Sequence, residues 1–477
     1  MRWTSTLPCV ALLLAACGDD ASMTPPLTAE QRRDPQACAD CHPDHLKQWS
    51  GSMHAYAGDD PVFRAMNARG QRETKGALGT FCLKCHAPVA VALGLTTDGL
   101  NLDTLPAWAR GVTCDFCHSV NGLDPKGGLS NNPLTLRDDG ALAAGIKDPV
   151  PNTAHASVYS ALHDGAEVRS ANLCGSCHDV LTPSGVPLER SLAEWQASIY
   201  AHSDSALRNT CIACHMPGRD GTAANVEGVK LRRVHDHANA AIDVALTDFP
   251  ERDTQRAKIQ HLLDATVLTE ICVVEASGGA DVEIYLENVA AGHGFPSGAA
   301  ADRRVWLSVN ASAAGAPLLT VGDIPDGEAV PEPGADPDLW LLRDTIYDAN
   351  DTPTHNFWAA ARLESVILPA PNGVQPGGEG YVNVHVPRRY RLLGGVPDRV
   401  EIAVQLQPIG IDVLKDLVAT GDLDAKYVAE MPTFTLGGTV QAWTRETAQS
   451  RVSAYSQRDA LCVGFNAQSR RNTPPGR

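Results

Sequence analysis

The chain has 477 residues, with 39 Lys and Arg against 56 Asp and Glu, which gives a formal net charge of -17 at pH 7. At roughly 150 residues per domain this length corresponds to about three domains, and the acidic balance excludes the basic surface that nucleic-acid binding requires. Hydrophobic residues make up 43% of the chain but aromatic residues only 5%, so we expect something other than aromatic side chains to fill part of the interior.

The amino terminus has the plan of a secretory signal, with one Arg followed by an apolar run over residues 7–16. This run is about half of the roughly 20 residues that cross a membrane. The letters LAAC that end at Cys17 resemble a bacterial lipoprotein box, in which cleavage precedes a lipidated Cys; an ordinary signal cleaved nearby is the alternative. We expect a signal peptide over 1–16, then lipidated Cys17 and a flexible tether over 17–36. Gly18 favours the outer membrane of the bacterial envelope, with the periplasmic or surface face left open.

Five Cys-x-x-Cys-His motifs dominate the next part of the chain, where chance predicts roughly 0.01 matches. Zinc sites do not require His directly after every Cys pair, and a redox dithiol has a single pair, so the motifs predict five covalently bound haem c groups. The thiols that would bond the haem vinyl groups are Cys38, Cys41, Cys82, Cys85, Cys114, Cys117, Cys174, Cys177, Cys211 and Cys214. The expected proximal iron ligands are His42, His86, His118, His178 and His215.

Second axial ligands must come from the remaining side chains. Eleven of the 16 His lie outside the motifs and Met numbers only six, so His/His ligation is favoured over His/Met. The first candidates are His54, His155, His237 and His293. Weaker candidates are His163, an alternative to His155 for the same haem, His235, an alternative to its neighbour His237, and His202. This set barely suffices for five haems, so one five-coordinate iron remains possible.

A resemblance to a known family supports several of these ligands. Cys38 to His42, followed by Trp49, Ser52 and His54, resembles the first motif of the multihaem cytochromes c, in the branch that contains the tetrahaem acceptor of electrons from hydroxylamine oxidoreductase. The resemblance implies that His54 ligates a haem and that a His-containing segment, here around His237, follows the last motif.

Two later segments carry the resemblance further. Trp195, Ser198 and Tyr200 form a degenerate copy of the first motif, in which Tyr200 stands where His54 stands in the first. The letters AGHGFPSG around His293 resemble a Gly-His-x-x-Pro-Ser-Gly signature that follows haem domains in related proteins.

The second half of the chain has a different pattern. We expect a haem domain over 37–243, a linker helix over 244–266 and a β-sandwich-like domain over 267–470, which makes the protein a multidomain α+β chain with a mostly helical or irregular haem part. Strands are predicted at the alternating stretches 282–286, 305–309, 381–386 and 400–406, and a helix within 408–430 that covers one end of the sheet. Cys272 and Cys462 bracket this domain, and an oxidising compartment favours a disulfide between them, which restricts the unfolded chain by roughly 4 to 5 kcal/mol.

Three functions fit this organisation. The first is electron transfer by a membrane-anchored pentahaem cytochrome between periplasmic or cell-surface redox partners, because no Gly-x-Ser-x-Gly or His-Glu-x-x-His motif is present and an acidic surface suits basic partners. The second is a haem-dependent oxidoreductase that acts on a small nitrogen or sulfur compound at one five-coordinate iron; Tyr200 favours it, whereas the lack of a Cys-x-x-Cys-Lys site does not. The third is a structural role in a surface assembly.

Overall fold

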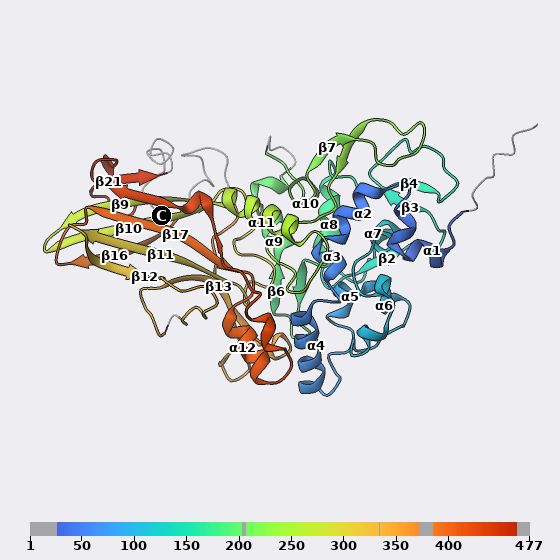
Figure 1. The fold of residues 1–477 in the computed structure, drawn as a ribbon, viewed down its shortest axis with the longest axis horizontal. Helices are drawn as coiled ribbons and strands as arrows, with labels where there is room; N and C mark the ends of the chain where they lie inside the picture. Colours follow the sequence, from blue (N-terminus) through green and yellow to red (C-terminus); the bar gives the residue numbers. More distant parts are fainter. Residues whose placement is uncertain (1–25, 203–206, 333, 372–384, 465–477) are drawn as a thin grey trace, which may run out of the picture.

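The computed structural model describes residues 26–202, 207–332, 334–371 and 385–464. The expected signal peptide and Cys17 lie outside the described residues. Figure 1 shows a helical part built from the first half of the chain and a sheet-rich part built from the second, joined along one side. Within the described ranges, no helix is long and apolar enough to cross a membrane.

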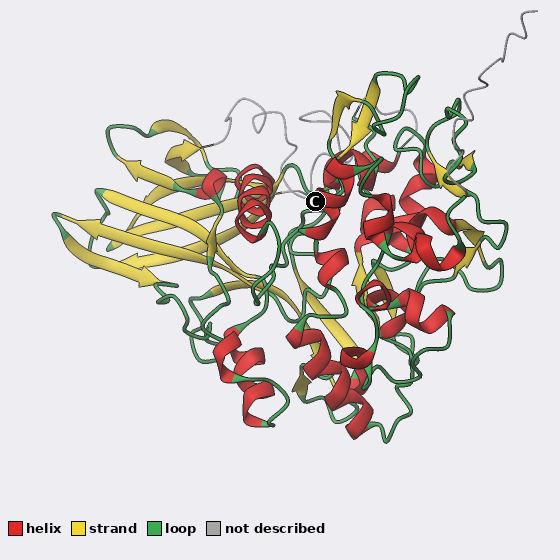
Figure 2. Ribbon diagram, turned by 45° about the vertical axis from the view of Figure 1, so that its right-hand side comes forward, coloured by secondary structure: helices red, strands yellow, loops and turns green. Residues whose placement is uncertain are grey.

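The helical part consists of short helices joined by long loops, as Figure 2 shows. Its helices are α1 (Ala29–Arg33), α2 (Pro43–Ser50), α3 (Met53–Tyr56), α4 (Pro61–Glu73), α5 (Leu83–His86), α6 (Pro88–Ala92), α7 (Cys114–Ser119), α8 (Ala171–Gly175), α9 (Ser191–Gln196) and α10 (Cys211–His215). Its largest clusters of buried apolar residues contain only a few side chains each. Such small clusters do not form a continuous protein core, which agrees with the scarcity of aromatic residues.

Four two-stranded sheets lie among these helices. They are β1 (Val120–Leu123) with β2 (Leu134–Leu136), β3 (Leu142–Ala144) with β4 (Ser157–Tyr159), β5 (Asp179–Leu181) with β6 (Pro187–Arg190), and β7 (Gly218–Gly221) with β8 (Arg232–His235). Only the β3–β4 pair is parallel among them. The first three pairs lie in loops that connect Cys-x-x-Cys-His segments, and the fourth follows the last of these segments.

The carboxyl end of the predicted tether is structured, contrary to our expectation for residues 17–36. Helix α1 begins with a capping box at Thr28, in which Thr28 and Gln31 exchange side-chain and backbone hydrogen bonds. Arg32 lies 3.7 Å from Asp115 of α7, and the Leu27 amide donates to the Ala154 carbonyl. The capping box and these contacts attach residues 27–36 to the helical part, so any flexible tether ends earlier.

Helix α11 (Arg252–Thr266) leads directly into the sheet-rich part. The strands of this part form two antiparallel sheets. The strand order is β16-β10-β9-β21-β20 in the first sheet and β14-β13-β11-β17-β18 in the second, and β12, β15 and β19 also pair with strands of the second sheet. The bounds are β9 (Val267–Ala276), β10 (Gly279–Asn288), β11 (Arg304–Ala313), β12 (Ala316–Val321), β13 (Trp340–Tyr347), β14 (Pro353–Thr354), β15 (Arg362–Val366), β16 (His385–Leu393), β17 (Arg399–Gln407), β18 (Phe434–Thr435), β19 (Gln441–Thr444), β20 (Gln449–Val452) and β21 (Asp459–Gly464).

The two sheets pack face to face around one large apolar core. Alternate residues of β10, such as Val282 and Ile284, join the same buried cluster as Val305 and Leu307 of β11. This period-two placement of core side chains is what the predicted strands 282–286, 305–309 and 400–406 required, and the residues of β10 between them are buried as well. Of the predicted strand 381–386, residues 381–384 lie outside the described residues and the remainder begins β16.

The predicted helix within 408–430 is shorter than the apolar pattern indicated. Helix α12 covers Ile411–Ala419 and ends where Gly421 adopts a positive φ of 77°. Its buried side chains Leu414 and Leu417 belong to the core of the two sheets. Its other side meets α4, where Arg69 of α4 forms an ion pair with Asp416.

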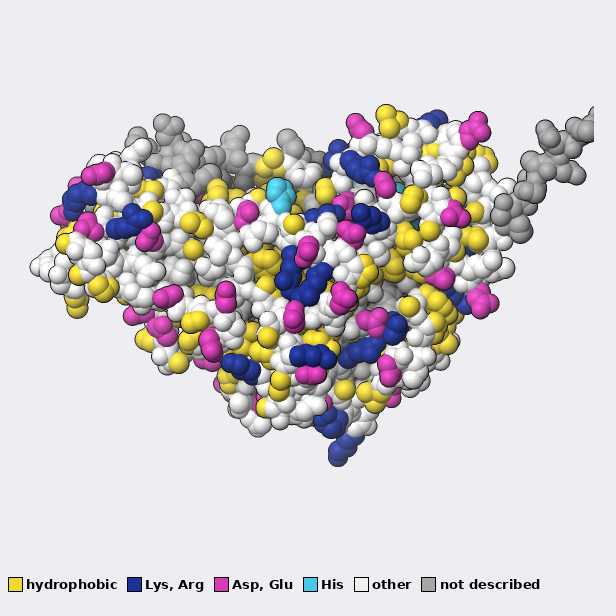
Figure 3. Space-filling model, viewed as in Figure 1, with side chains coloured by type: hydrophobic (Ala, Val, Ile, Leu, Met, Phe, Trp, Pro, Cys, Tyr) yellow, Lys and Arg dark blue, Asp and Glu magenta, His cyan; other side chains and the backbone are white. Residues whose placement is uncertain are grey.

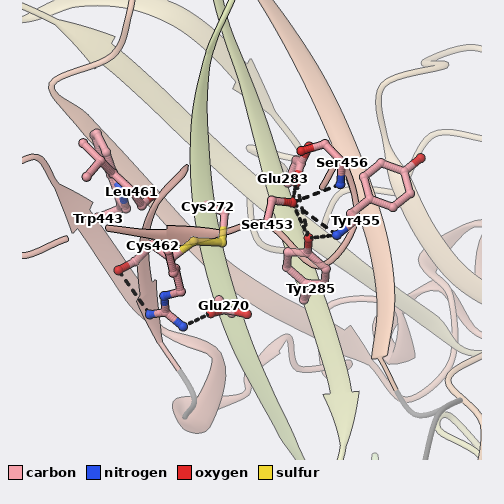
Figure 4. Close-up of a disulfide and its surroundings, with 11 residues drawn as sticks. Glu270, Cys272, Glu283, Tyr285, Trp443, Ser453, Tyr455, Ser456, Leu461 and Cys462 are labelled. Atoms are coloured by element: carbon pink, nitrogen blue, oxygen red, sulfur yellow. Dashed lines mark hydrogen bonds and ion pairs between the residues drawn. A yellow bond between two sulfur atoms is a disulfide. The ribbon is translucent and has the colours of Figure 1, made fainter. Parts of the chain in front are cut away.

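A disulfide joins two neighbouring strands of the first sheet, β9 and β21. Cys272 of β9 and Cys462 of β21 are directly opposite each other in the antiparallel register, and the structure links them. Figure 4 shows the disulfide beside Glu270 and Trp443. The bond therefore closes a loop of 190 residues around the sheet-rich part.

Candidate haem-binding sites

Each Cys-x-x-Cys-His segment forms about one helical turn. The His42 amide donates to the Cys38 carbonyl at 2.8 Å, and the His178 amide donates to the Cys174 carbonyl at 3.1 Å. This spacing places two thiols and one imidazole on the same side of a turn. A haem could then be bonded at its edge by both thiols while the imidazole faces its iron.

The ten motif thiols are all unpaired in the described structure, although several lie in contact. Cys38 is within hydrogen-bonding contact of Cys114, Cys85 of Cys177, and Cys174 of Cys211. Each contact joins two different motifs. Thiols from neighbouring motifs are thus close together while each keeps its sulfur free for another covalent partner.

Four of the five motif imidazoles have Nδ1 next to a backbone carbonyl. The distances from Nδ1 to oxygen are 2.7 Å for His42 to Ala223, 3.3 Å for His86 to Ala57, 2.6 Å for His118 to Ala143 and 2.8 Å for His215 to Ala240. Nδ1 donates in this arrangement, which fixes the tautomer and leaves Nε2 with a lone pair for a metal. The structure therefore presents these rings in the form that an iron ligand needs.

The fifth motif imidazole, that of His178, has no such carbonyl contact in the described structure. Its side chain is exposed, yet the surrounding protein desolvates the imidazole and lowers its pKa. Burial also lowers the pKa of His86 and His54 to about 4, so both are neutral at pH 7 and able to bind a metal.

The spacing of imidazole pairs tests whether an iron fits between them. Two Nε2–iron bonds of about 2 Å, with each ring centre about 1.1 Å beyond its nitrogen, separate the centres of two axial imidazoles by about 6.2 Å. Four motif histidines have a partner at this spacing. The ring-centre distances are 6.4 Å for His42 and His155, 6.2 Å for His178 and His54, 6.3 Å for His118 and His237, and 6.3 Å for His215 and His293. The donor set therefore fits four bis-histidine haems.

His155 and His163, which we treated as alternatives for one haem, lie beside different motif histidines. His155 pairs with His42, whereas the ring centre of His163 is 5.7 Å from that of His118. Nε2 of His163 is 2.8 Å from the Cys117 carbonyl, which holds this ring on the side of the motif itself. The geometry thus favours His237 over His163 as the partner of His118.

The two other weaker candidates are placed less favourably. Nδ1 of His235 is 2.8 Å from the Met216 carbonyl, and the imidazole of His235 lies against Gly165. No ring pairing joins it to a motif histidine in the described part of the chain. His202 is exposed at the end of the turn Ile199–Ala201.

His86 differs from the other four motif histidines. Among the residues that the structure describes, no second imidazole lies at the pair spacing from it. Instead, the ring of Phe63 stacks on it face to face, with ring centres 4.0 Å apart and an angle of 2° between the planes. Phe63 is on α4, and the apolar pattern of that helix gave no sign of this contact.

The degenerate copy of the first motif folds like the first. Trp49 donates to the Val112 carbonyl and Trp195 to the Asn209 carbonyl, while Ser52 and Ser198 each accept a backbone N–H at the start of the next turn. The hydroxyl of Tyr200 donates to the Val289 carbonyl at 3.1 Å. Tyr200 therefore contacts the segment that leads to His293, whose ring centre lies 6.3 Å from that of His215.

Two comparisons with known proteins agree with this architecture. Residues 37–119 match the family described as cytochrome c554 and c-prime. A solved structure, a penta-heme cytochrome c552 from Thermochromatium tepidum, has the same fold with a TM-score of 0.57 and 20% sequence identity, over 88% of this chain and 98% of that chain. No curated protein matches. The fold class is thus multidomain α+β, and the family match supports a multihaem cytochrome with covalent haem c in the amino-terminal part of the chain.

Proposed function

We propose that the chain binds five haem c groups and transfers electrons between redox proteins. Five Cys-x-x-Cys-His turns, four of which meet a second imidazole at 6.2 to 6.4 Å, carry this proposal. Haem supplies reversible one-electron chemistry when bound. The residues of the chain would hold each ring system covalently and, at four of the five sites, fix the tautomer of its proximal ligand.

The thiol contacts support a connected series of haem sites. Three of these contacts connect different sites. The first site meets the third through Cys38 and Cys114, the second meets the fourth through Cys85 and Cys177, and the fourth meets the fifth through Cys174 and Cys211. Cys117 in the third site is also close enough to Cys174 in the fourth for the two thiols to interact. Neighbouring attachment points this close favour electron transfer through the whole set.

The proposal extends to the location and partners of the protein. We infer export by the signal peptide, attachment to the bacterial envelope through lipid on Cys17, and electron exchange with redox partners that present basic surfaces. The lipoprotein-like letters around Cys17 and the net charge of -17 support these inferences.

A second function, an oxidoreductase for a small nitrogen or sulfur compound, is favoured by one observation. His86 has no second imidazole at the pair spacing among the described residues, so a sixth ligand position would stay open there. Asp243 is close enough to act electrostatically on His86 and His178, and Arg303 binds Asp243 through two N–H groups at 2.6 and 3.0 Å. Such fixed charges beside an open iron suit a small polar substrate.

Electron paramagnetic resonance of the ferric protein, with a pyridine haemochrome assay, tests both functions. We expect five haems, of which four are low-spin and the haem at His86 is high-spin. A high-spin signal that changes on addition of nitrite, hydroxylamine or sulfite favours the oxidoreductase. If all five haems are low-spin, electron transfer is the only one of the two functions that remains. Fewer than five haems would contradict the proposal itself.

A further inference from the structure

The loop that carries His293 crosses from the sheet-rich part to the helical part. It connects β10 to β11, and its backbone packs against α9 and the turn that follows. A Cβ added to Gly292 would lie 3.5 Å from Trp195 and 3.6 Å from Tyr200. His293 thus reaches the His215 site only if this loop is held in one position on the other part of the protein.

The carboxylate of Glu194 accepts hydrogen bonds from the loop at two positions after His293. Oε2 of Glu194, on α9, accepts from the Gly294 amide at 3.0 Å and from the Ser297 hydroxyl at 3.3 Å. A Cβ at position 294 would lie 3.0 Å from this oxygen and 2.6 Å from Ile367. Gly294 therefore allows the backbone to approach the carboxylate directly beside the candidate ligand.

Glu194 is itself held in place by neighbouring charges. Nε of Arg190 lies 3.3 Å from Glu194, and the two terminal nitrogens of Arg190 donate to Asp344 of the sheet-rich part at 2.8 and 3.2 Å. The hydroxyls of Ser191 and Ser297 add a contact of 2.8 Å. Several polar side chains, and not one contact alone, thus define the position of the loop: Arg190, Ser191, Glu194, Ser297 and Asp344.

The far side of the loop is fixed from within the sheet-rich part. Nδ2 of Asn288 donates to the His293 carbonyl at 2.8 Å and to the Pro369 carbonyl at 3.1 Å. Nδ1 of His293 is 2.8 Å from the Gly294 carbonyl, so its Nε2 faces away from the loop. The resulting ring lies within 8° of parallel to that of His215.

We propose that Glu194 is a positioning residue, which seats the His293 loop so that the imidazole binds the iron of the haem at His215. This inference rests on the proposed haem ligation. Because the Gly294 amide is adjacent to the ligand, loss of its hydrogen bond frees the backbone on one side of His293. The sheet-rich part would then hold the His215 haem in its six-coordinate form through Glu194.

The test compares four variants of the full-length, haem-loaded protein by electron paramagnetic resonance and by redox titration. His293→Ala should convert one low-spin haem to high-spin. Glu194→Ala should convert a fraction of the same haem and shift its midpoint potential. Ser297→Ala, which removes the longer bond to Glu194 and the contact with Ser191 but keeps the bond from Gly294, should have a smaller effect. Glu194→Gln should restore the native signals, because its amide oxygen still accepts from Gly294.

The outcomes separate the inference from the ligation on which it rests. An exposed glutamate on β17, Glu401, serves as the control, and Glu401→Ala should leave every signal unchanged. If His293→Ala alters the spectrum while Glu194→Ala and Ser297→Ala do not, the positioning role is wrong and the ligation stands. If His293→Ala leaves all low-spin signals intact, His293 is not a ligand, and both the pairing and the role of Glu194 are rejected.

Discussion

At the scale of single residues, the proximal ligands follow from a sequence motif, but the pairing of distal ligands does not. The Cys-x-x-Cys-His spacing is local, since one helical turn determines it. A pair such as His54 and His178 joins positions more than a hundred residues apart, and only the tertiary fold brings their rings to 6.2 Å. The backbone carbonyls that fix the motif imidazoles are equally invisible in the sequence, because any residue type can supply them.

The pairing at His118 gives a residue-scale prediction. His237→Ala should convert one low-spin haem to high-spin, because its Nδ1 is bonded to the His235 carbonyl and its Nε2 is available for iron. His163→Ala is the matched control and should leave the haem low-spin, since Nε2 of His163 is already occupied by the Cys117 carbonyl. Magnetic circular dichroism of the ferric protein distinguishes the two. The reverse result would assign the ligand to His163.

Glu189 gives a second prediction at this scale. Burial raises the pKa of Glu189 to about 7, partly offset by Arg303. The folded protein therefore keeps this proton at pH values where the unfolded chain releases it, so the free energy of unfolding falls as the pH rises from about 4.5 to about 7. Glu189→Gln should remove about 1 to 3 kcal/mol of this pH dependence.

Denaturant unfolding followed by circular dichroism at several pH values measures this effect. Glu401→Gln is a suitable comparison, because its partner Arg399 lowers the pKa of Glu401 and the residue is exposed. An equal pH slope in the native protein and in Glu189→Gln would show that the carboxyl is ionised throughout this range.

At the scale of elements, the sequence predicts the strands better than the helices. Alternating apolar residues identify β10, β11 and β17 because each sheet buries one face against the other. Most helices of the helical part span only four to eight residues, which is too short for a periodic apolar face to identify them. Helix α1 was not predicted, because its five residues are mainly charged and show no apolar pattern. Its capping box and its contact with α7 hold it in place.

The disulfide between β9 and β21 gives an element-scale prediction. Replacing both Cys272 and Cys462 by Ser should lower the free energy of unfolding of the sheet-rich part by about 4 kcal/mol, because the bond closes a loop of 190 residues. The haem content and the low-spin signals should not change, since neither cysteine belongs to a haem motif. Chemical denaturation followed by tryptophan fluorescence measures the loss. A loss below about 1 kcal/mol would mean that the strand register alone holds the two strands together.

At the scale of the whole molecule, charge decides which partners can approach. Figure 3 shows acidic and basic side chains interleaved over the visible face, without one large patch of a single sign. The net charge of -17 nevertheless produces a negative field at a distance. The sequence predicts the sign of this field from composition alone, whereas the point at which a partner docks depends on which haem edges reach the surface. Cys214 is the one exposed motif cysteine in the described structure, although the surrounding protein still desolvates its thiol and raises its pKa.

The salt dependence of electron transfer tests this electrostatic argument. We expect the rate constant for oxidation of the reduced protein by a small cationic redox protein to fall by at least tenfold between low salt and about 0.5 M salt, because screening shortens the range of the attraction from about 30 Å to under 10 Å. Stopped-flow absorbance in the haem band measures the rate. A neutral small-molecule oxidant of similar potential is the control and should react at a rate that salt barely changes. If the cationic protein shows no salt dependence either, its docking depends on local contacts, and the net charge of the chain does not steer its partner.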